Sequence, residues 1–245
     1  MPTPNLHFQR FEFKYFLPKN KADKIIPALL NHMRWDPYIS ASGHDFYIVN
    51  SLYFDNHNFS CFWDKEAGVA DRKKLRYRYY NQDKDNLFVE IKRKKDALVI
   101  KDRIKLNNSD NTSISQALYQ FRLTHKDHRF SQEVSWFKTK NCLQPKIFLS
   151  YKRKALIGRI DPKFRVTFDY DIKATMSNNL SSNPYFYKNI YPKGTVLELK
   201  YNNVLPSWFH RIIQKYQLNR IAFSKYCNSV RVLMPQFDDN NYSPD

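Results

Sequence analysis

The stretch KLRYRYYNQDKDNLFVEIKRKK, residues 74–95, alternates charged and apolar side chains on both sides of a polar segment. Successive side chains of a β-strand point to opposite faces of a sheet, so this period of two predicts two strands joined by a turn. Lys74, Arg76 and Arg78 share one face of the first strand, and Glu90 and Lys92 share one face of the second. The other face of both strands is apolar. The sequence therefore predicts a hairpin with one apolar face and one mainly cationic face.

Four further segments divide in the same way. Their charged faces carry Arg10, Glu12 and Lys14 in RFEFKYFL; Lys101, Arg103 and Lys105 in VIKDRIKL; Arg165, Thr167, Asp169 and Asp171 in RVTFDYDI; and Glu198 and Lys200 in VLELKY. An ordinary sheet with its charged face in water explains any one of these strands, because exposed charge pairs are common and contribute only ~0–1 kcal/mol each. Arginine and lysine dominate most of the set, however, and this favours a face that binds an anion.

The composition supports an anionic partner. Forty-one lysines and arginines against 23 acidic residues give a formal net charge of +18. Such an excess points to nucleic acid, a phosphorylated metabolite or an anionic membrane. The three cysteines are isolated and form no CxxC pair, which argues against a disulfide framework or structural zinc and favours a reducing compartment. The sequence has no apolar run of membrane-spanning length and no signal-peptide core, so we expect a soluble cytoplasmic protein with peripheral membrane contact, or a membrane-protein partner, left open.

The pattern of segments predicts an α+β fold. Strands are expected at 10–17, 47–55, 74–80, 87–94, 98–106, 146–154, 163–172 and 195–201, and helices at 20–34, 114–123, 131–140, 206–216 and 219–233. Many strands with few βαβ units indicate an antiparallel sheet that carries helices and that could close into a barrel. We expect a single domain over residues 1–235, ending in a helix, and an acidic disordered tail over residues 236–245.

A barrel with its charged face inward and helices on its apolar outside would be a cationic tunnel. Small barrels normally fill their interior with apolar side chains, so a charged lining needs a ligand or water to compensate it. Phosphates supply that compensation, because arginine binds phosphate oxygens in pairs and lysine offers a point charge. Embedded carboxylates would then hold a divalent metal on the phosphates. The sequence thus predicts a site for a phosphate chain or a triphosphate, with a metal.

The motifs RFEFKY, SLYFDN, KLRYRYY, FVEIKRK, YKRKAL, RVTFDYDI, VLELKY and FSKY follow one another over nearly the whole chain. Their order and spacing resemble the VTC domain, a polyphosphate polymerase domain of the triphosphate tunnel (CYTH-like) superfamily, in its bacterial stand-alone form. The resemblance implies an eight-stranded antiparallel tunnel with helices outside. It also implies transfer of the γ-phosphate of ATP to a growing polyphosphate chain, with Mn²⁺ or Mg²⁺. ATP and polyphosphate are the expected partners, and no nucleic acid is expected.

The resemblance and the strand faces together define the expected site. The residues that match the family's catalytic positions are Lys14, Arg76, Arg78, Lys92, Arg153, Arg165 and Glu198. Expected substrate contacts are Arg10, Lys94, Lys101, Arg103, Tyr53, Tyr151, Lys200, Ser224 and Lys225, of which the two tyrosines fit packing equally well. Glu198 is the expected metal ligand, supported by Glu12 and Glu90.

One departure separates this sequence from the hydrolytic members of the superfamily. Those members usually begin with E-x-E-x-K, whereas this chain has a cation, Arg10, in place of the first carboxylate. Fewer carboxylates favour transfer to an already ionised phosphate over activation of water. Two alternatives stay open: a tunnel-fold triphosphatase, which would release free phosphate, and a non-catalytic module that binds polyphosphate or RNA. The sequence contains no P-loop and no nucleophile elbow.

Overall fold

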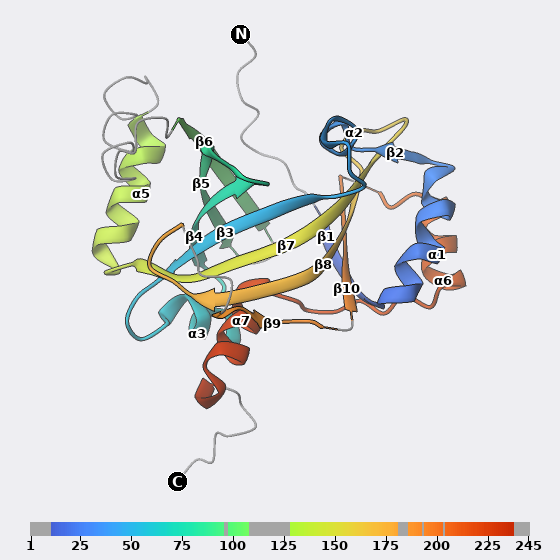
Figure 1. Ribbon diagram of the computed structural model, residues 1–245. Helices are drawn as coiled ribbons and strands as arrows, with labels where there is room; N and C mark the ends of the chain where they lie inside the picture. Colours follow the sequence, from blue (N-terminus) through green and yellow to red (C-terminus); the bar gives the residue numbers. More distant parts are fainter. Residues whose placement is uncertain are drawn as a thin grey trace. The chain divides into compact units, whose positions relative to one another are not determined.

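The computed structural model describes residues 11–95, 98–107, 128–180, 186–192, 194–202 and 204–237. The chain forms an α+β fold (Figure 1). It divides into two compact units. The first unit contains the residues up to Ile48 together with Ser150–Lys173 and Asn189–Lys225. The second contains Val49–Leu149, Ala174–Lys188 and the residues from Tyr226 onward. Strands β3 (Tyr47–Asp55), β7 (Gln144–Gly158) and β8 (Arg165–Met176) contribute residues to both units.

Ten strands form one hydrogen-bonded sheet. In the first unit the order is β1 (Phe11–Pro18), β10 (Gly194–Tyr201), β8 and β7, with β2 (Met33–Trp35) paired to β7 and β9 (Lys188–Asn189) paired to β8. In the second unit the order is β7, β3, β4 (Arg72–Tyr80), β5 (Asp83–Lys95) and β6 (Leu98–Asn107). Every pairing with a defined register is antiparallel, which confirms the predicted sheet. Within the described ranges the main path has eight strands and is open, with β1 and β6 at its ends.

The apolar face of the first unit is covered by helices. Leu17 of β1 and Leu197 of β10 are fully buried against Ile25 and Leu29 of α1 (Lys19–Leu30). Helix α6 (Ser207–Lys215) adds Phe209 to the same core and lies beside α1 (Figure 1). The short helix α2 (Pro37–Ser42) follows β2. The predicted division into an apolar face and a charged face is therefore observed in this unit.

The second unit has its own core on the apolar face of β4 and β5. Leu75, Val89 and Ile91 are fully buried, and they pack with Val134 and Phe137 of α5 (His128–Lys140). Two further helices complete the unit, α3 (Ser60–Glu66) and α7 (Lys225–Leu233), with the short 3₁₀ helix η2 (Pro235–Phe237) after them. None of the helices in the described part of the chain is long and apolar enough to cross a membrane.

The segment that precedes α7 lies along the edge of β1. The backbone N–H of Ile221 donates to the carbonyl of Lys14 at 2.8 Å, and Tyr15 forms a β-bridge with Arg220. The Lys14 ammonium returns a hydrogen bond to the carbonyl of Phe223 at 2.9 Å. Residues 219–224 belonged to the helix predicted at 219–233, but they are not helical, and Arg220 and Ile221 bond to β1 instead. Helix α7 therefore begins only at Lys225.

Other boundaries also differ from the prediction. The helix expected at 20–34 ends at Leu30, because residues 33–35 form β2. Helices α2 and α3 and strands β2 and β9 were not predicted. The helix expected at 114–123 and residues 238–245 of the expected tail lie outside the described residues. The three cysteines are free thiols.

Candidate functional site

The charged face of the first unit begins with two neighbouring E-x-K strands. In the β1–β10 register Glu12 lies opposite Lys200 and Lys14 lies opposite Glu198. Directly opposed residues of an antiparallel pair project to the same face, so these four charges form a compact block. Lys14 lies 3.1 Å from Glu12, and Lys200 contacts Oε1 of Glu198. Each carboxylate thus has a lysine of its own strand beside it.

A second layer of this cluster is centred on Asp169 of β8, which is fully buried. Arg153 of β7 donates from Nε to Oδ1 at 2.6 Å and from its terminal nitrogen to Oδ2 at 2.8 Å. The Lys225 ammonium lies 2.5 Å from the same Oδ2. Both cations lie over the Tyr151 ring, at 5.2 Å and 4.9 Å from its centroid. Oε2 of Glu198 is 3.9 Å from each of the two cations.

The cations keep both buried carboxylates ionised. Burial acts to raise the pKa of Glu198, but the charges of Lys200, Lys14, Lys225 and Arg153 outweigh burial and hold that pKa well below its usual value. Burial likewise opposes ionisation of Asp169, and Arg153 and Lys225 lower its pKa below the ordinary value. The cluster therefore presents two carboxylates that are charged at neutral pH.

Arg165, another expected phosphate ligand, has partners that the sequence did not predict. Its guanidinium lies 2.8 Å from Oδ2 of Asp36 and donates to the Tyr47 hydroxyl at 3.1 Å. Asp36 also accepts a hydrogen bond from the backbone of Tyr38, which caps α2. The unpredicted helix thus helps to position an expected functional arginine.

The second unit builds a different cluster around Glu90 of β5, whose side chain is 1% exposed. Arg76 donates from Nε to Oε2 of Glu90 at 2.7 Å, and Lys101 lies 2.6 Å from Oε1. Arg78 is 3.7 Å from Glu90 and donates to the Ser51 hydroxyl at 3.0 Å. Burial opposes ionisation, but Arg76, Arg78 and Lys101 hold the pKa of Glu90 well below its usual value. One carboxylate, that of Glu90, therefore lies within ion-pair distance of three cations.

Further cations lie on this face of the second unit. Lys74, Lys92 and Lys101 are aligned across β4, β5 and β6 in the strand register. The Lys74 ammonium lies 4.6 Å from the Tyr226 ring centroid and 3.2 Å from Sγ of Cys227. Like charges that lie directly opposite one another in neighbouring strands repel. This arrangement therefore favours the binding of an anion to this face of the sheet.

The remaining predicted residues are placed as follows. Tyr53 is buried and accepts a hydrogen bond from Arg76 at 2.8 Å. Lys94 is opposite Arg72, and the exposed Arg103 lies over the Phe88 ring. Ser224 is half-buried next to Lys225, whereas Arg10 lies outside the described residues.

Asp55 and Tyr226 form a buried pair that the sequence did not indicate. The Tyr226 hydroxyl donates to Oδ2 of Asp55, and its ring stacks on Tyr53 with 5.2 Å between centroids. Asp55 also accepts the backbone N–H groups of Cys61 at 2.9 Å and Phe62 at 3.2 Å, at the start of α3. This pair fixes α7 next to the tyrosine that holds Arg76.

Comparison with known protein families identifies the family of this chain. A model of the VTC domain matches residues 9–234. The chain belongs to the VTC domain family. The search of curated proteins gave no match.

Solved structures of the triphosphate tunnel fold resemble this VTC chain. One is HpAC1 from Hippeastrum, an adenylyl cyclase candidate described as having a dominant triphosphatase activity; it has a TM-score of 0.53, 11% identity, and coverage of 92% of this chain and 97% of that chain. Another is a candidate adenylate cyclase from Bacillus halodurans, with a TM-score of 0.50, 13% identity, and coverage of 91% and 96%. At such identities the similarity establishes the fold, and the tunnel fold expected from the sequence is supported.

The carboxylates of the VTC chain fit a metal that is held mainly by substrate phosphates. Among the described residues, no three acidic, histidine or cysteine side chains gather into a metal-binding group. Mg²⁺ is often bound by one or two carboxylates together with substrate phosphates, so a complete protein cage is not required. Glu198 suits this use, because it is ionised and its Oε2 contacts cations only at 3.9 Å. Glu90 suits it less, because both of its oxygens are in close contact with cations, Oε2 with Arg76 at 2.7 Å and Oε1 with Lys101 at 2.6 Å.

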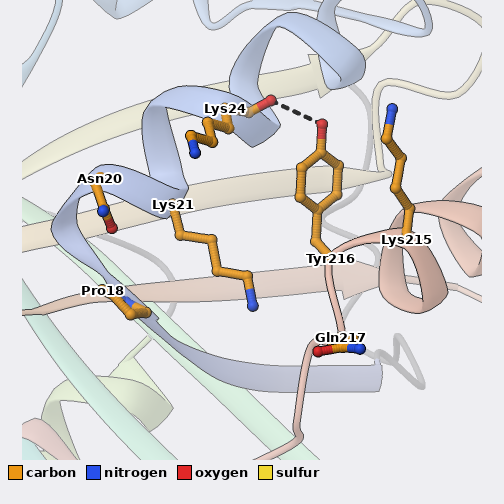
Figure 2. A pocket seen from close by; sticks show the side chains of 7 residues that line it. All are labelled: Pro18, Asn20, Lys21, Lys24, Lys215, Tyr216 and Gln217. Atoms are coloured by element: carbon orange, nitrogen blue, oxygen red, sulfur yellow. Dashed lines mark hydrogen bonds between the residues drawn. The ribbon is translucent and has the colours of Figure 1, made fainter.

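A pocket of about 350 Å³ lies elsewhere in the first unit, at the start of α1 and the end of α6 (Figure 2). It is lined by three lysines, Lys21, Lys24 and Lys215, with Tyr216 donating from its hydroxyl to the Lys24 carbonyl at 3.0 Å. The lysine side chains extend in different directions and do not converge on one point. The pocket shares no residue with the charged clusters, so we assign the candidate site to the strand faces.

Proposed function

We propose that this VTC chain is a polyphosphate polymerase that transfers the γ-phosphate of ATP to the end of a polyphosphate chain, with Mn²⁺ or Mg²⁺. The observation that carries the proposal is the buried Glu198, held ionised among Lys14, Arg153, Lys200 and Lys225. Membership of the VTC domain family supports the same reaction. In the reaction, a terminal oxygen of the chain bonds to the γ-phosphorus, the bond to the β-phosphate oxygen breaks, and ADP leaves.

The ionisation of the carboxylates favours phosphate over water as the acceptor. A hydrolase needs a group that removes a proton from water, and such a base works best with a pKa near the operating pH. The pKa values of Glu90, Asp169 and Glu198 are all lowered, which makes each a weak base. A terminal phosphate is already ionised and needs no base, so positioning and charge stabilisation are sufficient.

In the second unit Arg76 and Arg78, which Glu90, Tyr53 and Ser51 hold in place, would bind phosphate oxygens. Lys92 and Lys101 would add positive charge along the phosphate chain. Arginine is suited to the first role because its planar guanidinium can donate two hydrogen bonds to one phosphate.

In the first unit Lys14, Arg153 and Arg165 would stabilise the charge that develops on the transferred phosphate. Glu198 would hold the metal together with the phosphates, and Glu12 would support it through Lys14. When bound, the metal would neutralise part of the negative charge of the phosphates. Lys200 and Lys225 would keep Glu198 ionised before the metal enters.

The decisive experiment is incubation of the purified protein with ATP and Mn²⁺, followed by a gel stained for polyphosphate and an assay for ADP. A ladder of long chains with an equivalent amount of ADP is the expected result. Free phosphate without a ladder would instead indicate a triphosphatase, the activity described for the tunnel-fold protein HpAC1. Binding of polyphosphate without any turnover of ATP would indicate a non-catalytic binding module.

A further inference from the structure

Asp169 is a fully enclosed charge of the first unit, with 0% exposure. The roles proposed above give it no contact with substrate. Both of its oxygens are nevertheless engaged by two residues of the candidate site, Arg153 and Lys225. These cations come from different elements, β7 and the start of α7, and Asp169 is the group that they share.

The distances around Glu198 suggest what this sharing achieves. Arg153 and Lys225 lie 2.5–2.8 Å from Asp169 but 3.9 Å from Oε2 of Glu198. The second distance exceeds that of a hydrogen bond. Glu198 is a second carboxylate within 4 Å of both cations, so it would attract them if the charge of Asp169 were lost. Direct contact with them would occupy the oxygen that faces away from Lys200.

We propose that Asp169 is a positioning residue that holds Arg153 and Lys225 away from Glu198, so that Oε2 stays accessible to a metal that the substrate phosphates bind. The Tyr151 ring lies beneath both cations and also limits their movement toward Glu198. Asp169 therefore controls metal-dependent binding without touching metal or substrate. The inference rests on the proposed function only for its effect on polymer synthesis, because binding can be measured separately.

The test compares Asp169→Asn with wild type by calorimetric titration of the β,γ-imido analogue of ATP, with and without Mn²⁺. In Asp169→Asn the gain in affinity that Mn²⁺ produces should fall by about 10- to 100-fold, as for other residues that orient metal ligands. Affinity without metal should stay equal or increase, because the variant has one negative charge fewer. General damage to the site would weaken binding under both conditions, and that result would overturn the proposal. An unchanged gain from Mn²⁺ would overturn it as well.

The matched control is Asp171→Asn, on the same strand. Asp171 pairs with Lys152 at 3.0 Å, and Lys152 has no role in the candidate site. The control should keep the full gain from Mn²⁺. An equal loss in both variants would show that the effect follows from net charge, against the proposal.

A double variant, Asp169→Asn with Lys225→Met, covers the case in which Asp169→Asn folds poorly. It removes one of the two cations that the first change leaves without a counter-charge, so it should unfold at a higher temperature than Asp169→Asn. It should also recover part of the gain from Mn²⁺, because one competitor for Glu198 is gone. No recovery in a folded double variant would contradict the proposal. A wild-type protein that binds the analogue but makes no polyphosphate would remove the polymerase function and leave this test valid.

Discussion

The charged faces of the two units differ in the balance of their charges. In the first unit Lys14, Arg153, Lys200 and Lys225 are matched by Glu12, Asp169 and Glu198. In the second unit Glu90 lies within ion-pair distance of Arg76, Arg78 and Lys101, and Lys74 and Lys92 lie opposite each other on the same face. A balanced cluster can hold its geometry without a ligand, whereas an excess of cations gains most from a bound anion. We therefore expect the first cluster to govern the chemistry and the second to govern affinity for phosphate.

The strongest test of this division is Glu198→Gln. The amide keeps the shape of the side chain but cannot hold a metal as a carboxylate does, so ATP turnover should fall by about 100-fold or more. Turnover is measured as ADP release under saturating ATP and Mn²⁺, with circular dichroism to verify folding. Glu12→Gln, at a more exposed E-x-K position, serves as the control and should lose far less. Full activity of Glu198→Gln would remove the metal role and the distinction between the clusters.

Glu90→Gln should act mainly on stability. The change leaves Arg76 and Arg78 without their buried counter-charge, and the loss of one partner of a buried pair costs about 3–5 kcal/mol. We expect the lower end, because the Lys101 side chain is 37% exposed and water screens it. Urea unfolding measures the change in the free energy of unfolding. Inorganic triphosphate should restore more stability to this variant than to wild type; equal restoration would argue against an anion on this face.

Acid should destabilise the protein through the same carboxylates. The folded-state pKa values of Glu90, Asp169 and Glu198 are lowered, whereas unfolded carboxyls titrate near ~4. Their contribution to stability is thus fully present above about pH 5 and is lost as the pH falls below the unfolded values toward the folded ones. Urea unfolding at pH 7, 5, 4 and 3.5 should show a plateau and then a decline. The decline should be shallower in Glu90→Gln, and an unchanged slope would exclude Glu90 as a contributor.

The smallest effect is expected for Glu133→Gln, which lies outside both clusters. Glu133 of α5 pairs with Arg93 and with Lys73 on partly exposed side chains. Such pairs contribute roughly 0–1 kcal/mol, so the free energy of unfolding should change by no more than that. ATP turnover should stay at the wild-type value. A loss of turnover would show that the functional surface extends to this helix.

The division of each strand into a charged face and an apolar face could be predicted from sequence, because it depends only on the alternation of neighbouring residues. Alternation placed Lys14, Arg76, Glu90 and Glu198 on charged faces, and the register brings each beside a residue of opposite charge. Helix α2 also had a local signal, since Asp36 precedes a proline at the first helical turn and caps it. That signal was missed because the helix is only six residues long.

The remaining features depended on contacts that no alternation or capping pattern in the sequence marks. The start of α3 is held by Asp55 at the end of β3, while its own first residue before the helix, Phe59, has a φ of 56°. Phe59 itself makes no capping hydrogen bond, and the backbone N–H of Ser60 donates instead to Asn56 Oδ1 at 2.9 Å. The pairing of Arg165 with Asp36 and of Arg153 with Asp169 likewise depends on the assembled sheet. Alternation shows that these residues lie on charged faces of their strands. Which cation pairs with which carboxylate depends on the order and register of the strands in the folded sheet.

The segment at residues 220–223 has a consequence for the behaviour of the protein in solution. Sheet margins with unused N–H and C=O groups recruit strands from other molecules, and proteins often cover them. Here the chain covers its own first strand, through Ile221 and the Tyr15–Arg220 bridge. A truncation before Arg220 would uncover that margin and make the polypeptide prone to self-association. The covering segment leads directly into Lys225, so the stretch that covers the margin of β1 also brings a lysine to the candidate site.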